Sequence, residues 1–141
     1  MSKQYIQYHK VWKHGNPLLF PRPKAFTSDI PQKQGHAFSA IEERSRVWLI
    51  YRDSEESKEY YLAYTFTAVD FELEGEKIIL FSEPGKAEVF MPPIALNRKK
   101  DSWFAELMSR HGNFGLGFMP LNEDGVCNLE AILASSSTVP R

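Results

Sequence analysis

Residues 46–51, with the sequence RVWLIY, carry the strongest strand signal in the chain. A continuous apolar run of this length, with charged residues around it, predicts a central strand that is buried on both faces. A polar turn at 53–58 follows, and residues 60–73 predict a long strand because they are rich in aromatic and β-branched side chains. On the N-terminal side, residues 37–43 predict a short helix that leads into the central strand.

More strands are expected on both sides of this pair. Turns at 74–76 and 83–86 introduce two further strand-like runs, at 77–81 and 87–90. Residues 5–12 predict a first strand, because rings and polar side chains alternate there. Successive strands joined by short turns predict an antiparallel meander, which can curl into a partly closed barrel as its twist accumulates.

Two helices with apolar faces are expected in the last third of the chain. Asp101 or Ser102 can cap the first, which carries Trp103, and Asn122 can cap the second. Residues 114–118, between the two helices, predict a strand. The predicted fold class is therefore α+β: a twisted, partly closed antiparallel β-barrel with two or three flanking helices.

The length and composition fit one folded domain. The chain has 141 residues, of which 43% are hydrophobic and 25% charged, and this balance predicts a packed core. We expect a single domain over residues 1–134 and a linker or outlying tail over 135–141. Residues 14–36 contain four prolines and predict an ordered, extended loop. Cys127 is the single cysteine, so no internal disulfide can form, and we expect a cytoplasmic protein.

Charge is distributed unevenly along the chain. Residues 1–50 hold eight Lys and Arg against three Asp and Glu, whereas residues 51–141 hold nine against fifteen. Such an asymmetry is typical of a chain with one electropositive face, although ordinary variation over a solvated surface gives the same count.

The sequence contains no complete catalytic or metal-binding pattern. The four histidines lie at spacings that fit no zinc site, and Cys127 is expected on the apolar side of the last helix. Asp70, Glu72 and Lys77 leave open a small hydrolase or nuclease, although a charged strand end at a solvated turn gives the same pattern. We expect no catalysis by this chain alone and no cofactor or metal.

Aromatic residues interleaved with cations are the feature that points to a function. Phe, Trp and Tyr make up 13% of the chain. Residues 8–14 read YHKVWKH, Arg46 precedes Trp48 by two positions, and residues 98–100 (RKK) precede Trp103. Exposed rings stack on nucleic-acid bases while Lys and Arg neutralise phosphates, so this pattern favours nucleic-acid binding.

The arrangement of these segments resembles the PUA-like superfamily, which includes the EVE, YTH, ASCH and SRA domains. The resemblance rests on residues 46–51 and 60–69, on the opening YHKVW at 8–12, and on Pro92-Pro93-Ile94 followed by Trp103-Phe104. It covers residues 5–134. The same segments resemble bacterial reader domains that precede the nuclease domains of modification-dependent restriction enzymes.

The resemblance implies a curved barrel whose concave face accepts a flipped, modified base of DNA in an aromatic pocket. By position, Trp48 and Phe66 would lie near that pocket, and Tyr8, Trp12 and the loop 14–36 would edge it. Asn16, Ser28, Asp29 and Ser39 are candidates for contacting the base edge. The predicted nucleic-acid-binding residues are Tyr8, His9, Lys10, Trp12, Lys13, Asn16, Arg22, Lys24, Ser39, Trp48, Phe66, Arg98, Lys99, Lys100 and Trp103.

Two partners are therefore expected, together with one alternative. The module would bind modified duplex DNA and act with a C-terminal nuclease domain or a partner protein in bacterial defence. The alternative is a protein-interaction or inhibitor module, whose acidic second half mimics DNA and binds a basic partner.

Overall fold

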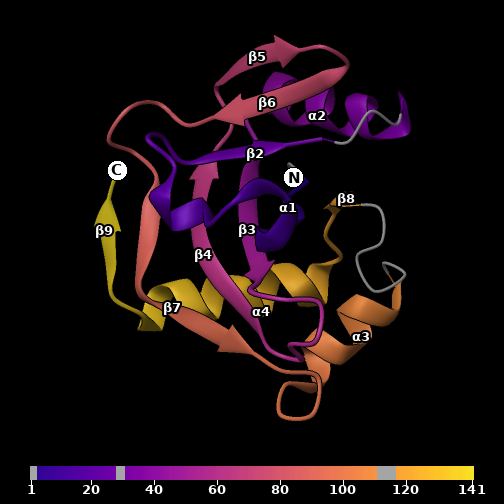
Figure 1. The fold of residues 1–141 in the computed structure, drawn as a ribbon, viewed down its shortest axis with the longest axis vertical. Helices are drawn as coiled ribbons and strands as arrows, with labels where there is room; N and C mark the ends of the chain where they lie inside the picture. Colours follow the sequence, from indigo (N-terminus) through magenta and orange to yellow (C-terminus); the bar gives the residue numbers. More distant parts are fainter. Residues whose placement is uncertain (1–2, 28–30, 111–116) are drawn as a thin grey trace.

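The computed structural model describes residues 3–27, 31–110 and 117–141, and for residues 31–34 it describes the backbone only. The chain is α+β, as predicted, and its strands form two sheets (Figure 1). The larger sheet has six strands in the order β8-β1-β3-β4-β7-β9. Its strands are β8 (Phe118–Pro120), β1 (Tyr5–Lys10), β3 (Arg46–Arg52), β4 (Tyr60–Thr67), β7 (Glu88–Leu96) and β9 (Thr138–Pro140).

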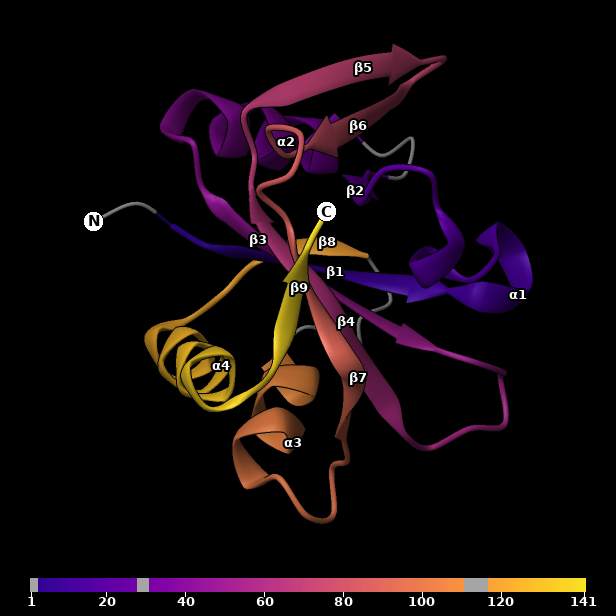
Figure 2. The same cartoon turned by 90° about the vertical axis from the view of Figure 1, so that its left-hand side faces the viewer.

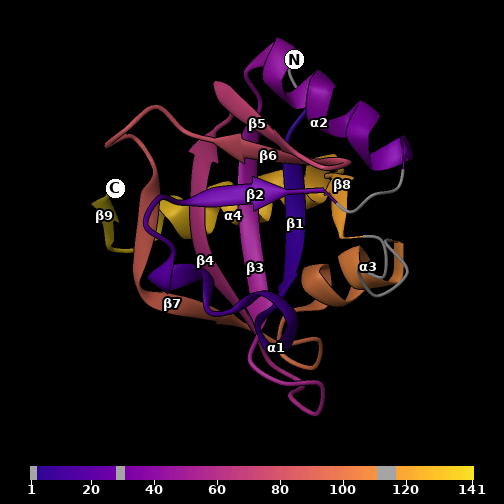
Figure 3. The same cartoon turned by 45° about the horizontal axis from the view of Figure 1, so that its top comes forward.

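A second sheet of three strands lies on one face of the first. Its strands, in spatial order, are β2 (Lys24–Phe26), β6 (Lys77–Phe81) and β5 (Asp70–Glu74). The helices of the described residues are α1 (Val11–His14), α2 (Pro31–Glu43), α3 (Ser102–Arg110) and α4 (Glu123–Ser135), with a 3-10 turn at Pro17–Leu19. Helices α3 and α4 cover one side of the larger sheet, while α2 and the small sheet lie on the other (Figure 2). The small sheet crosses the strands of the larger one (Figure 3).

Strand β3 lies inside the larger sheet and is buried on both faces, which confirms the prediction made from RVWLIY. Val47, Leu49 and Tyr51 belong to the apolar cluster that lies under the small sheet and α2. Trp48 and Ile50 belong to the cluster under α3 and α4. The alternation of a strand therefore divides these side chains between two cores.

A bulge in β4 changes which side chains face the small sheet. Leu49 lies opposite Tyr64 and Ile50 lies opposite Leu62, so Ala63 is the extra residue. Ala63 and Tyr64 consequently both join the cluster under the small sheet. The Tyr64 hydroxyl donates to the carbonyl oxygen of Lys24 at 2.6 Å, and this bond fixes β2 over the larger sheet.

The sheet is mixed, whereas the sequence predicted antiparallel strands. β1 and β3 run parallel, with Tyr5 opposite Val47 and Lys10 opposite Arg52. A parallel pair needs a long connection, and the chain supplies one by passing through α1, β2 and α2 between the two strands. In the described residues neither sheet closes on itself, because β8 and β9 stand at the edges of the larger sheet and β2 and β5 at the edges of the smaller one.

The predicted strand at 60–73 is two strands in two sheets. The amide of Ala68 donates to Ser45 beside the larger sheet, and the amide of Val69 donates to Phe81 of the small sheet. The chain therefore changes sheets at these two residues. β5 and β6 form a hairpin in the small sheet, and β7 returns to pair with β4.

Several predicted boundaries were wrong. Val11 and Trp12 start the helix α1 instead of continuing β1, and α2 begins at Pro31 instead of residue 37. The predicted tail is part of the fold, since Ser135 ends α4 and β9 pairs with β7. Cys127 was expected on the apolar side of the last helix, but its side chain is exposed on α4. Of the predicted strand at 114–118, residues 114–116 lie outside the described residues.

The helix predictions in the last third were more accurate. Helix α3 begins at Ser102 and buries Phe104, Leu107 and Met108. Asn122 caps α4, and its side chain accepts the amide of Gly125 at 2.8 Å.

Candidate nucleic-acid interface

Positive charges from four separate elements gather around His14. The pKa of His14 is lowered, first by partial burial and then by the charges of Lys77, Lys13, Lys10 and Lys24. These lysines come from β6, α1, β1 and β2, so the packing of the small sheet on the larger one brings them together. We call His14 and these four lysines the lysine patch.

Two phenylalanine rings accompany the cations of the lysine patch. A pocket of about 130 Å³ is lined by His14, Phe20, Lys24, Phe26, Glu74, Lys77 and Ile79. The Nζ atom of Lys24 lies 4.7 Å from the centre of the Phe20 ring, and that of Lys77 lies 5.8 Å from the centre of Phe26.

His9, one of the predicted nucleic-acid-binding residues, is buried beside this pocket and packs against its rings. Its side chain is fully buried, its Nε2 lies 2.7 Å from the carbonyl oxygen of Gly15, and its ring meets Phe20 and Phe26 edge-on. The pKa of His9 is lowered to about 4, first by burial and then by the charges of His14 and Lys24, while the hydrogen bond to Gly15 acts in the opposite direction. His9 is therefore neutral at physiological pH and donates its Nε2 proton to Gly15.

The loop after α1 is built by local capping. Gly15 has a φ of 84°, a left-handed conformation that favours glycine. The Asn16 side chain accepts the amide of Leu18 at 2.9 Å, and Pro17 starts the 3-10 turn. Asn16 thus turns the chain towards Phe20. Its side-chain oxygen already accepts a hydrogen bond from Leu18 in the same loop.

Trp48 and Phe66 are core residues in this structure. Trp48 is fully buried, and its Nε1 donates to the side chain of Gln4 at 2.8 Å. Phe66 is 1% exposed and belongs to the apolar cluster on the opposite face of the sheet. The sheet separates these two rings, so they do not line one pocket.

The rings of Tyr8 and Trp12 surround an arginine. The guanidinium carbon of Arg52 lies 5.7 Å from the centre of Tyr8, 5.3 Å from Trp12 and 5.5 Å from Tyr60. Its Nε donates to the Tyr8 hydroxyl at 3.0 Å, and its Nη1 donates to the carbonyl oxygen of Ser57 at 3.3 Å. We call these three rings and Arg52 the Arg52 cage. The sequence predictions missed Arg52 and Tyr60, although Arg52 directly follows the central strand motif.

The other predicted residues are distributed around the molecule. Arg22 donates to the carbonyl oxygen of Ser82 at 2.7 Å and lies over the Phe81 ring. Arg22 therefore links the loop that precedes β2 with the end of β6. Ser39 is exposed on α2, beside Glu42 and Glu43. Two groups remain. Arg98, Lys99 and Lys100 are exposed in the turn between β7 and α3, Trp103 packs on Phe104, and Ser28 and Asp29 lie outside the described residues.

The acidic residues considered for a nuclease lie on an exposed edge strand. All five residues of β5 are exposed, and Asp70 lies 3.7 Å from Arg22. Glu74 pairs in register with Lys77 and lines the pocket of the lysine patch. Within the described ranges, no group of three or more His, Cys, Asp or Glu side chains is placed to hold a metal ion.

Comparisons with family models, with curated proteins and with solved structures found no match to this chain. None of the helices in the described part of the chain combines the length and the apolar composition that crossing a membrane requires.

Proposed function

We propose that this protein is a nucleic-acid-binding module, and that the lysine patch is its binding surface. The observation that carries the proposal is the pocket in which two lysines and His14 meet the rings of Phe20 and Phe26. Lysines neutralise phosphates, and an aromatic ring stacks on a base whatever its sequence. Phosphates would therefore lie along the lysines while one base enters the pocket.

The number of lysines sets the expected salt dependence. Each phosphate neutralised on B-DNA contributes about −0.9 to the slope of log K against log salt concentration, so four contacts give a slope of about −4. A single strand, with about −0.7 for each phosphate, gives a slope of about −3. The slope therefore measures how many lysines of the patch are engaged.

We further propose that the base is a modified one, flipped out of duplex DNA, as the likeness to PUA-like reader domains suggests. The two crossed sheets would then correspond to the partly closed barrel of that superfamily. The base would enter between Phe20 and Phe26, since Trp48 and Phe66 are buried. In this proposal the chain binds without catalysis, and a nuclease domain or partner protein acts on the DNA.

Fluorescence anisotropy tests the proposal with labelled duplexes that are unmodified, methylated at cytosine or adenine, or hydroxymethylated, and with single strands. Lys24→Gln and Lys77→Gln should each weaken binding and reduce the salt slope by about 1. The matched control is Lys86→Gln, because Lys86 is exposed in the turn before β7 and lies outside the patch. Equal binding by all three variants, or no binding to any nucleic acid at low salt, would refute the proposal.

An interaction with a basic protein is the second candidate, and β5 is the observation that favours it. Asp70, Glu72 and Glu74 are exposed on this edge strand, and Leu73 between them is 66% exposed. An unpaired edge with acidic and apolar side chains can accept a strand from a basic partner. A complex of this kind should dissociate in high salt and after Glu72→Lys, with no loss after Lys24→Gln.

A further inference from the structure

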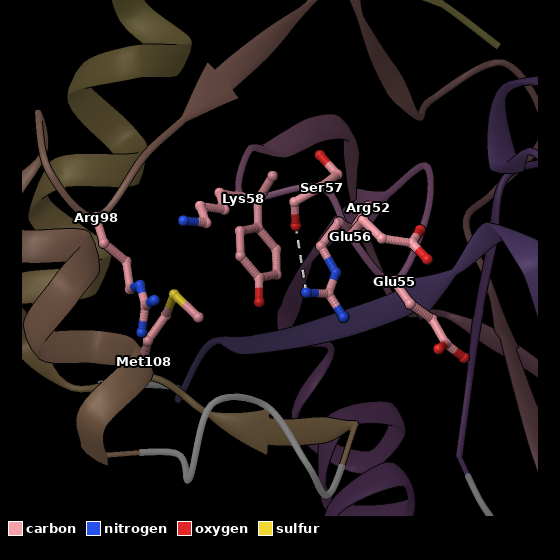
Figure 4. A pocket seen from close by; sticks show the side chains of 8 residues that line it. Arg52, Glu55, Glu56, Ser57, Lys58, Arg98 and Met108 are labelled. Carbon is pink, nitrogen blue, oxygen red and sulfur yellow. Dashed lines mark hydrogen bonds between the residues drawn. The ribbon is translucent and has the colours of Figure 1, made fainter.

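A second pocket lies beside the Arg52 cage, separate from the pocket of the lysine patch. It has a volume of about 330 Å³, which falls within the usual range for small-molecule sites. Three segments supply its walls: the β3–β4 turn, the turn after β7, and α3 (Figure 4). The lining residues are Arg52, Glu55, Glu56, Ser57, Lys58, Tyr60, Arg98 and Met108.

Arg52 is held in place before any ligand arrives. The rings of the Arg52 cage surround its guanidinium, and two hydrogen bonds, to Tyr8 and Ser57, fix its plane. Among the described residues, no carboxylate lies within 4.0 Å of Arg52. A half-buried cation without a carboxylate partner, in a fixed orientation, is suited to bind an anion.

Lys58 and Arg98 add two more cations on the same side of the pocket. Both side chains are exposed, and neither forms an ion pair within the part of the chain that the structure describes. Figure 4 shows Lys58 and Arg98 together on one side of Arg52, with Glu55 and Glu56 on the other. The two carboxylates therefore leave the Lys58–Arg98 side of the pocket positive.

The rest of the lining is mixed, with Tyr60 and Met108 as its apolar members and Glu55, Glu56 and Ser57 as its polar ones. Tyr60 is 5% exposed and Met108, from α3, is 2% exposed, so each offers a narrow apolar surface to the pocket. A ligand that fits this pocket therefore has an anionic group that contacts the three cations. It also has a planar or apolar part that contacts Tyr60 and Met108.

We infer that this pocket binds a phosphomonoester joined to a planar ring, such as a nucleoside monophosphate or the 5′-phosphorylated end of a nucleic-acid strand. A phosphomonoester carries about −1.5 to −2 charges at pH 7 and three acceptor oxygens, and so matches three cations better than a carboxylate does. The phosphate lies among Arg52, Lys58 and Arg98, and the ring lies against Tyr60 and Met108. This inference does not rest on the binding of nucleic acid at the lysine patch.

Isothermal titration calorimetry with the full chain tests the inference at low salt. The probes are AMP, UMP, adenosine, inorganic phosphate, and a short oligonucleotide with either a 5′-phosphate or a 5′-hydroxyl. The monophosphates should bind, adenosine should not, and inorganic phosphate should bind more weakly than AMP because it lacks the ring. A preference for the 5′-phosphorylated oligonucleotide over both AMP and the 5′-hydroxyl oligonucleotide would identify the strand end as the source of the phosphate.

Charge reversals at two exposed residues test where the ligand binds, because exposed side chains can be changed with little effect on the fold. Arg98→Glu and Lys58→Glu should each weaken AMP binding by at least about tenfold, the loss of one charge-assisted contact. Lys86→Glu, with the same change of charge on another surface, should leave AMP binding unchanged. The inference is overturned if no monophosphate binds at millimolar concentration, or if Arg98→Glu and Lys58→Glu bind AMP as the wild type does.

Discussion

The buried His9 should make the protein lose stability as the pH falls through the mildly acidic range. Its pKa is about 4 in the folded protein against an ordinary value of 6.5, because burial disfavours the charged ring. Below pH 6.5 the unfolded chain takes up a proton at this residue, whereas the folded chain does so only near pH 4. The stabilisation is therefore complete above pH 6.5 and is lost as the pH falls towards 4.

The size of this loss follows from the two pKa values. The shift corresponds to about 3 kcal/mol when complete, of which about 2 kcal/mol is lost between pH 7.5 and pH 5. Urea unfolding of the wild type and of His9→Gln at both pH values isolates the contribution, because every other titrating group is present in both proteins. The glutamine amide can still donate to Gly15.

We expect the free energy of unfolding to fall by about 2 kcal/mol more in the wild type than in His9→Gln over this interval. The absolute stability of the variant does not enter this comparison. Histidine NMR spectra of the wild type give an independent measurement, in which the His9 ring should remain neutral at pH 5. An equal loss in both proteins, or a His9 ring that titrates near 6.5, would refute the reasoning.

Two further predictions concern the core and the support of the lysine patch. Trp48→Ala should lower the free energy of unfolding by about 3–5 kcal/mol, since Trp48 is fully buried, and the folded fraction should still bind nucleic acid; selective loss of binding at unchanged stability would contradict the assignment to the core. Tyr64→Phe removes the hydroxyl that donates to the carbonyl oxygen of Lys24 and accepts its amide, so it should cost about 1–3 kcal/mol in urea unfolding and weaken binding at the patch. A variant as stable as the wild type would show that β2 is held by other contacts.

The local elements of the fold could be predicted where the sequence pattern is strong and continuous. The apolar run at 46–51 has enough hydrophobic residues to fill both faces of a strand, and it forms the buried strand β3. Asn122 could be identified as a cap because its side chain acts within one helical turn. Both signals are local, so they survive in any tertiary context.

The connections could not be predicted, because they depend on contacts between distant residues. Strand propensity continues across Ala68, and only pairing with Ser45 and Phe81 makes the chain change sheets there. Prediction from neighbouring strands also favoured antiparallel pairs, and it missed the long crossover that makes β1 and β3 parallel.

The sequence predicted which types of residue form the candidate site, but it did not predict which of them lie close together. The cations at 10–13 and Lys24 were predicted, but Lys77 joins them only because β6 pairs with β2. The rings of Tyr8 and Trp12 were expected at the edge of a base pocket, and in the structure they surround Arg52, which lies on β3. Sequence alone does not distinguish an aromatic ring that is free to bind a ligand from one that already contacts a cation of the same chain.

The position of β8 and β9 at the two edges of the larger sheet has a consequence for how the chain assembles. Both edge strands come from the last quarter of the sequence, while β1, β3, β4 and β7 precede them. During synthesis, the inner strands can therefore pair before their neighbours exist, leaving the outer edges of β1 and β7 with unpaired backbone groups. Exposed edges of this kind recruit strands from other molecules, so the nascent chain is most prone to aggregate just before its C-terminal strands emerge.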